Sequence, residues 1–593
     1  MSGAMASQRR ALLCAVFSAT LLPCASQVEI ARARVEAAKR NSSEPVPHEP
    51  GPTCCRLGKP CWPSKQDINE LRNALNPEMH RSLHWDGGDH PFPAPLAMGS
   101  VPPQPLFGLN SNLAPLYEKE VGAKPCGAPF LRDFCKVSVV NYPKPNSGNE
   151  WEPDIVVWPL TAGHVQTSLA FARRHGLCLS VAGTGHDYLM RHSNKGGMMI
   201  RTALLKGIEF TSADSVKVGA GHTFSEIIKA VSDQSPSTYI STGWAATVGV
   251  AGWSLGGGHG PYAGSKGLGV DNILSAEIVL ANGTLVNVSA KEHSDLLWAL
   301  RGGGGSTWGV LTSLTLRRFP TPAGGFTKWN FGWEGTADEA LDVVLNQTLD
   351  WKLRLDETWN CLVLLDPITL LRKSWIMTMR CVYTGGDLQE FHRQTDKILN
   401  AQIKPKLSFG KNFPNQFMAD LPSSAELDPL EAYIIPNKVF TDPLPSTLLS
   451  RETVASSHFS DLVKSWVRGC RGTSECGLFE FYFDLPHPKT VQNFPANSVA
   501  ISPTFRNAMC HMIYSKSAEI SFKNLSEASY FGESAYYQDG DSWKSRYWGS
   551  NYEGLLEVKK KYDPENFFWC RHCVGSDLPR KILAAPHAWP IIV

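Results

Sequence analysis

Three glycine clusters are the residues of this 593-residue chain whose types and spacing best suit chemistry. They occupy residues 183–187, 249–260 and 302–305, all within the stretch from 151 to 320. Glycine lets the backbone approach a ligand closely, and it leaves N–H groups available to phosphate oxygens. One cluster would mean little, but three in one module predict a site for a large cofactor that carries phosphate.

The two common nucleotide-binding motifs do not fit these clusters. A dinucleotide fingerprint, G-x-G-x-x-G, requires glycine three places after Gly185, where Tyr188 stands. A P-loop requires Gly-Lys-Ser/Thr, and the order in Gly264-Ser265-Lys266 is different. The cofactor must therefore be held by another arrangement.

The composition of the chain excludes several classes of protein. Lys plus Arg number 57 and Asp plus Glu number 55, so the net charge is +2, and we expect neither a nucleic-acid partner nor a membrane partner. Hydrophobic residues make up 42% and charged residues 19%, which is too apolar for a disordered chain. The length corresponds to roughly four domain-sized units. These features favour a large, loop-rich globular protein, and an enzyme in particular.

The N-terminus predicts secretion. Two arginines precede an apolar run at residues 11–22, and the small residues Cys24 and Ser26 follow it, which is the order of a secretory signal peptide. The run is too short to span a bilayer, which takes about 20 residues. We therefore expect a cleaved signal peptide at 1–26 and no transmembrane segment after it. Sequons for N-glycosylation are compatible with this compartment and begin at Asn41, Asn282, Asn287, Asn346 and Asn524.

Secretion also favours disulfides as the state of the cysteines. Loss of Cys14 and Cys24 with the signal peptide leaves thirteen of the fifteen, so at least one is free or bonded to another chain. Cys570 and Cys573 could instead bind zinc, but no second pair of ligands is adjacent to them. The other candidates for disulfides are the crowded Cys54, Cys55 and Cys61, then Cys126 and Cys135, and the close pair Cys470 and Cys476.

Strands and helices alternate around the glycine clusters. Short apolar or alternating runs predict strands at 154–159, 177–182, 215–219, 273–280 and 285–288. Helical patterns lie at 161–172, where Thr161 can cap the first turn, and at 224–231. Asn282-Gly283 predicts the tight turn of a hairpin between the last two strands. Together these elements predict an α+β or α/β module with a mixed sheet.

Residues 326–525 have a different texture. Strand-like runs lie at 360–365, 375–383 and 478–483. The last run alternates, with three phenylalanines on one face. Its other face carries Glu480, Tyr482 and Asp484. This polar face either lines a pocket or faces solvent, and the pattern does not distinguish the two.

Four segments of the chain, taken in order, resemble a known family. They are residues 159–188, 247–272, 295–305 and 547–564. In order and spacing they resemble the FAD-linked oxidases related to berberine bridge enzyme, within the vanillyl-alcohol-oxidase superfamily of flavoproteins. Cys61-Trp62-Pro63-Ser64 is similar to a stretch of the fungal-type members.

The resemblance implies an α+β fold with several parts. A PCMH-type FAD-binding domain of two α/β subdomains is expected at 151–325. A substrate domain, with an antiparallel sheet covered by helices, is expected at 326–525. A berberine-bridge-like segment at 526–577 is expected to return to the FAD domain. The remaining parts are the signal peptide, a flexible leader with a cysteine-bearing extension, and a tail, at 1–26, 27–150 and 578–593.

The resemblance also implies FAD as the cofactor. His186 stands where the family joins a histidine covalently to the flavin, and the backbone of Gly183, Thr184 and Gly185 stands where the pyrophosphate is held. The histidines lack the spacing and the carboxylate company of a metal site, so no metal is expected. The other positions assigned to the cofactor are Asp187, Val248, Gly249, Gly252, Gly256, Gly257, Gly258, His259 and Asn272.

Four positions refine this assignment. Ala182 replaces a basic residue before the linked histidine, so a side-chain contact to phosphate is lost. Ala245 stands where many members carry a second, cysteine link, so a single link through the histidine is expected. Val248 matches a position where a small residue admits oxygen to the flavin, which favours an oxidase. Trp253 replaces a histidine that lies near the flavin in some members.

The implied reaction is hydride transfer from a small alcohol, sugar or amine to FAD, with O2 as acceptor and H2O2 as product. It requires a base. Family members use a tyrosine of a Tyr-x-Asn-Tyr stretch or a glutamate on a substrate-domain strand. That glutamate has no clear equivalent in this sequence. The stretch here is Tyr530-Phe531-Gly532-Glu533, so Tyr530 and Glu533 are the catalytic candidates. Glu533 acts as base or positions substrate; alternatively, both residues only support the fold. A dehydrogenase, or a secreted binding protein without activity, is the alternative to an oxidase.

Overall fold

The computed structural model describes most of the chain between residues 54 and 580. The described ranges are 54–75, 107–108, 153–187, 189, 191–194, 196–235, 237–245, 248–368, 374–401, 403–405, 407–416, 445–469, 479–495, 497–514, 518, 522–525, 528–532 and 542–580. All of them belong to one compact unit. The predicted signal peptide, the leader, most of the cysteine-bearing extension and Glu533 lie outside these ranges. Within them, no helix is long and apolar enough to cross a membrane.

The first sheet has four strands in the order β1-β2-β4-β3. Their bounds are β1 Phe107–Gly108, β2 Ile155–Val157, β4 Met198–Arg201 and β3 Leu179–Ala182. Strands β2 and β3 both pair with β4 in parallel, so a crossover must join them. That crossover is helix α6 (Ala162–Arg174), whose first turn is capped by the Thr161 hydroxyl accepting from the His164 N–H. The predicted strands and helix cap are confirmed here.

The second sheet has the order β5-β6-β10-β8-β9, with β7 paired to β10 beside this path. The bounds are β5 Ile208–Ser212, β6 Ser215–Gly219, β7 Thr238–Ile240, β8 Ile273–Val279, β9 Leu285–Ser289 and β10 Val310–Pro320. The hairpin of β8 and β9 turns at Gly283, whose φ of 82° is the left-handed conformation that an Asn-Gly turn requires. The predicted hairpin is therefore confirmed.

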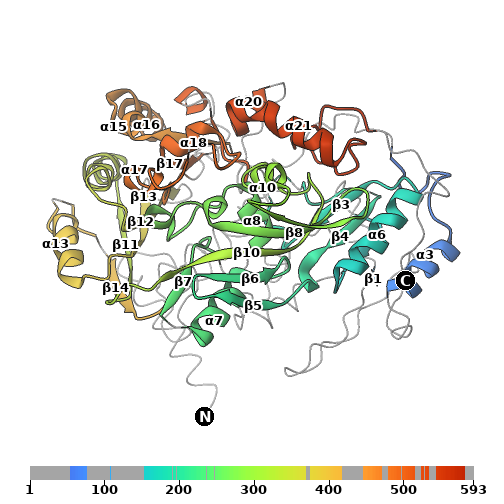
Figure 1. Ribbon diagram of the computed structural model, residues 1–593. Coiled ribbons are helices and arrows are strands. Elements are labelled where there is room, and N and C mark those ends of the chain that lie inside the picture. The colour runs from blue at the N-terminus through green and yellow to red at the C-terminus, as the bar shows by residue number, and fades with distance from the viewer. Residues whose placement is uncertain are drawn as a thin grey trace, which may run out of the picture. The chain divides into compact units, whose positions relative to one another are not determined.

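Helices from the middle and from the C-terminal end of the described chain share the core of this second sheet (Figure 1). Two of them, α7 (Phe224–Gln234) and α10 (Ser294–Leu300), follow strands of the sheet directly. The other two, α20 (Ser542–Trp548) and α21 (Tyr552–Tyr562), come from the C-terminal segment. The C-terminal segment therefore packs on the part of the molecule that carries the glycine clusters.

The third sheet is antiparallel throughout, in the order β14-β11-β13-β12-β16-β17-β15. Its strands are β11 Phe326–Gly335, β12 Trp359–Ile368, β13 Ser374–Tyr383, β14 Leu407–Phe413, β15 Ser446–Ser450, β16 Phe479–Phe483 and β17 Ala508–Ile513. All three strands predicted from the sequence of this region are present. The antiparallel sheet that the resemblance implied is confirmed.

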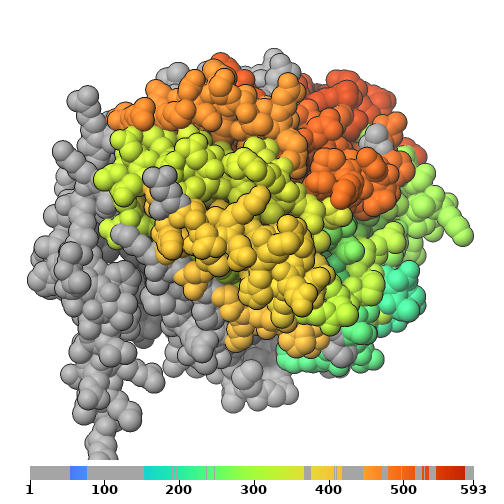
Figure 2. Space-filling model, turned by 90° about the vertical axis from the view of Figure 1, so that its left-hand side faces the viewer, coloured from blue at the N-terminus to red at the C-terminus, as the bar shows by residue number. Residues whose placement is uncertain are grey.

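Helices cover one face of this third sheet. They are α11 (Ala337–Leu341), the π-helix η3 (Asp342–Leu349), α12 (Asp350–Leu353), α13 (Leu388–Leu399), α15 (Arg451–Ala455) and α16 (Ser457–Gly469). Figure 2 shows this helical layer from outside, with α13 in yellow and α15 and α16 in orange. Their apolar side chains form one core with alternate residues of the strands.

The other face of the third sheet packs on the segment around the second glycine cluster. Leu362 of β12 and Tyr482 of β16 share a core with Tyr239 of β7 and with Tyr262, which precedes α9 (Ala263–Lys266). Because side chains alternate along a strand, Glu480 points to the same side of β16 as Tyr482. The polar face predicted for this strand is therefore turned into the molecule, and its residues are buried.

Four disulfides join cysteines within the described residues: Cys54–Cys178, Cys55–Cys61, Cys361–Cys381 and Cys570–Cys573. The last confirms a disulfide rather than a zinc site at the Cys-x-x-Cys motif. Cys361 and Cys381 are direct partners across β12 and β13, a pairing that depends on strand register. Cys510 is buried and unbonded, as the odd number of cysteines requires of at least one residue.

Candidate active site

One cavity collects residues from all three glycine clusters and from the third sheet. It encloses about 1120 Å³ of empty space, its opening to solvent included. The predicted site residues that line it are Gly183, Thr184, Gly185, His186, Asp187, Val248, Gly249, Gly252, His259 and Tyr530.

Three glycines of the cavity leave open the space where a side chain would stand. A Cβ atom at Gly183 or Gly252 would have no protein atom within 4 Å. A Cβ atom at Gly305 would meet only a methyl carbon of Leu255, at 4.0 Å. Their backbone is therefore open to the cavity, as close contact with a large cofactor requires. On this observation the residues present fit FAD.

Thr184 joins the first glycine cluster to the second. Its hydroxyl accepts a hydrogen bond from the Gly249 N–H at 3.0 Å. A Cβ atom at Gly249 would come within 3.1 Å of the Thr184 side chain, so glycine permits this approach. Gly185 has a φ of 87°, which a residue with a side chain rarely adopts. These features fix the turn that brings His186 to the cavity.

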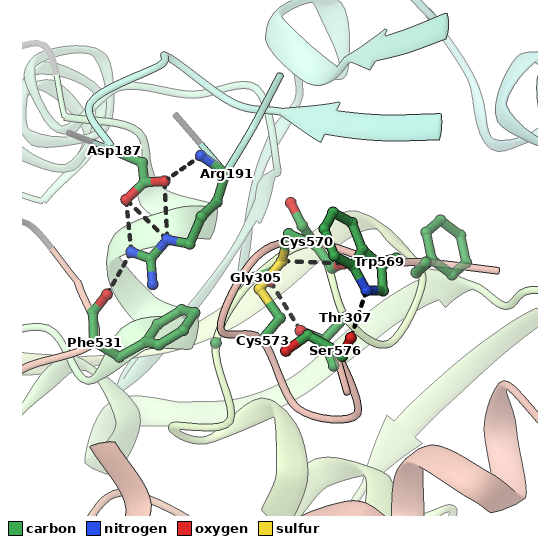
Figure 3. Close-up of a disulfide and its surroundings, with 12 residues drawn as sticks. Asp187, Arg191, Gly305, Thr307, Phe531, Trp569, Cys570, Cys573 and Ser576 are labelled. Carbon is green, nitrogen blue, oxygen red and sulfur yellow. Dashed lines mark hydrogen bonds and ion pairs between the residues drawn. A yellow bond between two sulfur atoms is a disulfide. The ribbon is translucent and has the colours of Figure 1, made fainter. Parts of the chain in front are cut away.

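A buried ion pair joins the first cluster to the C-terminal segment (Figure 3). Arg191 donates to Asp187 through Nε, at 3.0 Å to Oδ2, and through Nη2, at 2.6 Å to Oδ1. The same Nη2 donates to the carbonyl oxygens of Phe531, at 2.5 Å, and Gly532, at 3.1 Å. The guanidinium carbon also lies 3.8 Å from the centre of the Phe531 ring. The pair therefore holds the turn of His186 against the segment of Tyr530.

This ion pair also sets the charge of Asp187. Burial opposes ionisation, but the charge and hydrogen bonds of Arg191 outweigh it and hold the pKa of the Asp187 carboxyl below its usual value. Arg191 lines the cavity and was not predicted from the sequence. The spacing of four residues between an acid and an arginine is the feature that could have indicated it.

A second group of side chains meets the cavity from three distant segments. His259 Nδ1 lies 2.8 Å from Asp484 Oδ2, and Trp244 Nε1 donates to the same oxygen at 2.7 Å. The side chains of His259 and Asp484 are 4% and 0% exposed. Asp484 directly follows β16, whose Tyr482 lines the cavity. The polar face of this strand thus belongs to a pocket and not to a solvated surface.

Three aromatic rings surround His259. The ring centroids of Tyr482, His511 and Tyr530 lie 5.2, 5.2 and 5.0 Å from that of His259. The Tyr482 hydroxyl donates to Glu480 Oε2 at 2.8 Å. Glu480 is a buried glutamate on a strand of the third sheet, and the sequence had left open whether its face lines a pocket or faces solvent.

The structure does not bring four of the predicted cofactor residues to the cavity: Gly256, Gly257, Gly258 and Asn272. Two of these glycines instead bring the backbone against Tyr530. The Gly258 N–H donates to the Tyr530 hydroxyl at 3.2 Å, and a Cβ atom at Gly257 would lie 3.0 Å from the Tyr530 ring. The Asn272 amide donates to two carbonyl oxygens of the segment at the end of α9, at 3.0 and 2.8 Å. These residues do not line the cavity, and through such contacts they support the residues next to it.

The positions that refine the family pattern also have clear places. Ala245 and Val248 line the cavity, whereas Ala182 is fully buried in β3. Trp253 lines the cavity as well, and its Nε1 donates to the His259 carbonyl at 2.9 Å. A Cβ atom at Gly258 would lie 2.9 Å from the Trp253 ring. Trp253 therefore holds the loop that carries His259.

Comparisons with known proteins identify the same regions. A family model described as an FAD binding domain matches residues 153–289, and one described as berberine and berberine like matches 519–575. The FAD-linked oxidoreductase ZEB1 of Gibberella zeae is 29% identical over 461 residues, covering 70% of this chain and 75% of its own. The VAO-type flavoprotein oxidase VAO615 of Thermothelomyces thermophilus is 26% identical over 594 residues, covering 90% and 94%.

Solved structures show a likeness of fold. The VAO-type flavoprotein MtVAO713 from Myceliophthora thermophila C1 has a TM-score of 0.64 at 20% identity, covering 89% of this chain and 98% of its own. Two variants of Phl p 4 have TM-scores of 0.56 and 0.57 at 19% and 18% identity, covering 72% and 76% of this chain and 91% and 95% of theirs.

These findings define the class of the protein. With an FAD binding domain around the glycine cavity and homologues named FAD-linked oxidoreductases, the chain is an FAD-dependent oxidoreductase. Within that class, it carries an FAD binding domain and a berberine-like domain, and its relatives and structural neighbours are fungal FAD-linked oxidoreductases and VAO-type flavoproteins, to which it is similar. The resemblance carried by the four sequence segments is confirmed.

Proposed function

We propose that the protein is a secreted oxidase that takes hydride from a small alcohol, sugar or amine and produces H2O2 from O2. One observation carries the proposal: His186, Ala245 and Val248 line a single cavity together with His259 and Tyr530. The same space is thus surrounded by the position of the flavin link and by a residue that offers no second nucleophile. A small residue that leaves room for oxygen and ionisable side chains complete it. A relative that covers most of this chain is named a flavoprotein oxidase, which supports the assignment.

The glycine side of the cavity suits FAD. When bound, FAD supplies the hydride acceptor and afterwards the reductant of O2. The backbone of Gly183 and Gly185 would hold its pyrophosphate, and His186 would carry the covalent bond. Asp187, held by Arg191, would fix the turn on which His186 stands. One covalent link is expected, because Ala245 has no nucleophilic atom.

Tyr530 and Glu533 are the proposed catalytic pair. Tyr530 is buried at the cavity, and the hydrogen bond from the Gly258 N–H fixes its hydroxyl for contact with a substrate. Glu533 follows three residues later, outside the described ranges. The assignment of Glu533 as a base or as a substrate-positioning residue therefore rests on its place in the sequence alone.

Val248 favours an oxidase over a dehydrogenase. One variant of Phl p 4 is named a glucose dehydrogenase, and the variant with an added isoleucine-to-valine exchange is named a glucose oxidase. In that protein, the loss of one methylene group accompanies the change from a glucose dehydrogenase to a glucose oxidase. We assign a comparable steric role to Val248 of this chain, which lines the cavity.

Two features support secretion. Disulfides form and persist in oxidising compartments, and four join cysteines of the described residues. The sequons within the described residues are also exposed, as attachment of a glycan requires. Their asparagines are Asn282, Asn287, Asn346 and Asn524.

Flavin attachment and peroxide release test the proposal together. The purified protein should be yellow, its flavin should stay with the acid-precipitated chain, and a screen of alcohols, sugars and amines should release peroxide. His186→Ala should free the flavin from the precipitate. The matched control His192→Ala, which alters a neighbouring histidine of the cavity, should retain it. A colourless protein would contradict the proposal, and flavin reduction without peroxide would favour a dehydrogenase.

A further inference from the structure

His259 is placed for more than contact with a cofactor. Its Nδ1 lies 2.8 Å from Asp484 Oδ2, an oxygen that also accepts from the Trp244 indole. An indole nitrogen only donates, so Asp484 acts as an acceptor in this arrangement. An ionised Asp484 then requires Nδ1 of His259 to carry the ring hydrogen. The basic lone pair of the neutral imidazole is therefore on Nε2.

Burial strengthens this pair of side chains. The His259 and Asp484 side chains are 4% and 0% exposed, so water screens their interaction little. A carboxylate in this position holds the imidazole in one tautomer and stabilises the imidazolium that forms when Nε2 accepts a proton. His259 also lines the cavity, so this proton can come from a substrate.

Ionisable groups face the His259–Asp484 pair from several neighbouring elements. They are Glu480, Tyr482, His511, Tyr530 and Lys352. Most of them are occupied otherwise. The Tyr482 hydroxyl donates to Glu480, and Lys352 donates to the Trp359 carbonyl at 2.6 Å and lines a different cavity.

His511 differs from His259 although the two rings are neighbours. It is fully buried, and neither of its ring nitrogens has a hydrogen-bond partner among the described residues. Burial, followed by the nearby His259, holds the pKa of His511 well below its usual value. His511 therefore stays neutral and has no carboxylate to stabilise a proton. It provides a matched control for His259.

We propose that His259 is the proton acceptor of the reaction, that Asp484 is its positioning residue, and that the substrate is an alcohol. Of the two roles left open for Glu533, the proposal assigns it the positioning of the substrate. The inference deepens the proposed function and rests on it. The C–H bond of the alcohol breaks, and its hydrogen leaves with both electrons as hydride to FAD. The O–H proton goes to Nε2 of His259, and the O–H electron pair becomes the second bond of the carbonyl group. When O2 is reduced, this proton supplies the second hydrogen of H2O2.

The alcohol follows from the kind of group that the structure provides. A hydroxyl group must lose its proton as hydride leaves, because the product is a neutral carbonyl compound. An amine whose ammonium form has already lost its proton to water releases hydride by using its nitrogen lone pair, and it needs no acceptor during that step. A shielded imidazole with a fixed tautomer at the cavity therefore suits a hydroxyl group, whose proton must leave as the carbonyl group forms.

The test measures flavin reduction by alcohols and sugars without oxygen, over a range of pH. In the wild-type protein, kcat/KM should fall at low pH as His259 becomes protonated. His259→Gln should slow flavin reduction at least about 100-fold and remove this acidic limb. Asp484→Asn should move the limb to lower pH, because the protonated ring loses its carboxylate. His511→Gln should keep the limb where the wild type has it.

Two further measurements separate proton transfer from a structural role. Added imidazole should restore part of the flavin reduction in His259→Ala, which a merely structural residue would not permit. Diethyl pyrocarbonate modifies histidines without turnover of the enzyme. It should modify one histidine fewer in His259→Gln than in the wild type. Retention of the flavin spectrum in each variant shows that the cavity is intact.

The outcomes distinguish this inference from the proposed function. If an alcohol reduces the flavin of His259→Gln at the wild-type rate with the acidic limb intact, the inference is wrong and the oxidase proposal stands. If only amines reduce the wild-type flavin, the inference is also wrong. If alcohols reduce the flavin through the His259-dependent limb but no peroxide forms, the oxidase proposal fails and the role of His259 stands.

Discussion

The cavity has two kinds of wall, and they are built differently. We call the first the glycine wall, which consists of Gly183, Gly185, Gly249, Gly252 and Gly305. It offers backbone and, at Gly183, Gly252 and Gly305, open space. We call the second the side-chain wall, which consists of Trp244, His259, Tyr482 and Tyr530. It offers buried rings whose polar atoms are held by neighbouring residues.

This difference corresponds to two tasks. A cofactor that stays bound needs shape and backbone contacts, which short glycine-rich stretches provide locally. A substrate that is oxidised needs a group that accepts its proton, and that group must be tuned by partners. His259 and Trp244 find their partner Asp484 at sequence separations of 225 and 240 residues. Each piece of the first wall is therefore a short stretch visible in the sequence, whereas the pairs of side chains in the second exist only in the folded chain.

Filling the glycine wall is expected to have the largest effect. In Gly252→Leu the new side chain enters space where a Cβ has no protein atom within 4 Å, so the chain folds but the cofactor is excluded. Flavin content, measured by absorbance after purification, should fall to background. The apoprotein should be no less stable than wild-type apoprotein, because glycine within a helix costs about 1 kcal/mol relative to alanine.

The control for this change is Gly163→Leu. Gly163 is an exposed glycine of another helix, α6, so the substitution adds the same side chain away from the cavity. This variant should keep its full flavin content. Full flavin in Gly252→Leu would show that the glycine wall does not hold the cofactor.

The glycine wall was largely predictable, because its residues lie in three short clusters that are visible in the sequence and no other residue type gives the backbone the same freedom. The limit of this reasoning is visible at Gly257 and Gly258. Their φ values of 135° and 78° explain why glycine is required, but the rings that they approach are those of Tyr530 and Trp253, and not a ligand. A glycine motif predicts a close approach of the backbone, and the fold decides what approaches.

Breaking the contact between the first glycine cluster and the C-terminal segment should have the next largest effect. Arg191→Met leaves the Asp187 carboxylate without its partner and should cost about 3 kcal/mol of unfolding free energy at neutral pH. This is the lower end of the range for buried pairs, because the Asp187 side chain is 20% exposed. Chemical denaturation of the wild type and the variant measures the difference.

The pH dependence of this loss has a definite sign. In the wild type the pKa of Asp187 is lowered, so the pair stabilises the fold above the ordinary carboxyl value of about 4 and ceases to do so as pH falls through the lowered pKa. Without Arg191, burial raises the pKa of Asp187. In the variant the carboxyl is therefore protonated at a higher pH, and this removes the destabilising buried charge. The difference in stability should therefore shrink in acid. A constant difference would show that packing on Phe531, and not charge, is responsible.

The side-chain wall shows why part of the site was not predictable. The alternation in β16 indicated that Glu480, Tyr482 and Asp484 share a face, but it could not tell a pocket from a solvated surface. That choice depends on the packing of β16 over the segment around the second glycine cluster. His259 was assigned to the cofactor through the family resemblance, and its pairing with Asp484 requires the tertiary structure.

The smallest expected effect tests whether the two walls act separately. Val248→Ile adds one methylene group to the cavity and should slow the reaction of reduced enzyme with O2 about tenfold, which corresponds to about 1.4 kcal/mol of barrier. Rapid mixing of reduced enzyme with oxygenated buffer measures this step, and anaerobic mixing with substrate measures flavin reduction. Val248→Ala, the control, should not slow the oxygen step. A gate for oxygen alone would leave flavin reduction, and with it proton transfer at His259, unaffected. If isoleucine slows flavin reduction and the oxygen step equally, residue 248 therefore shapes the whole cavity.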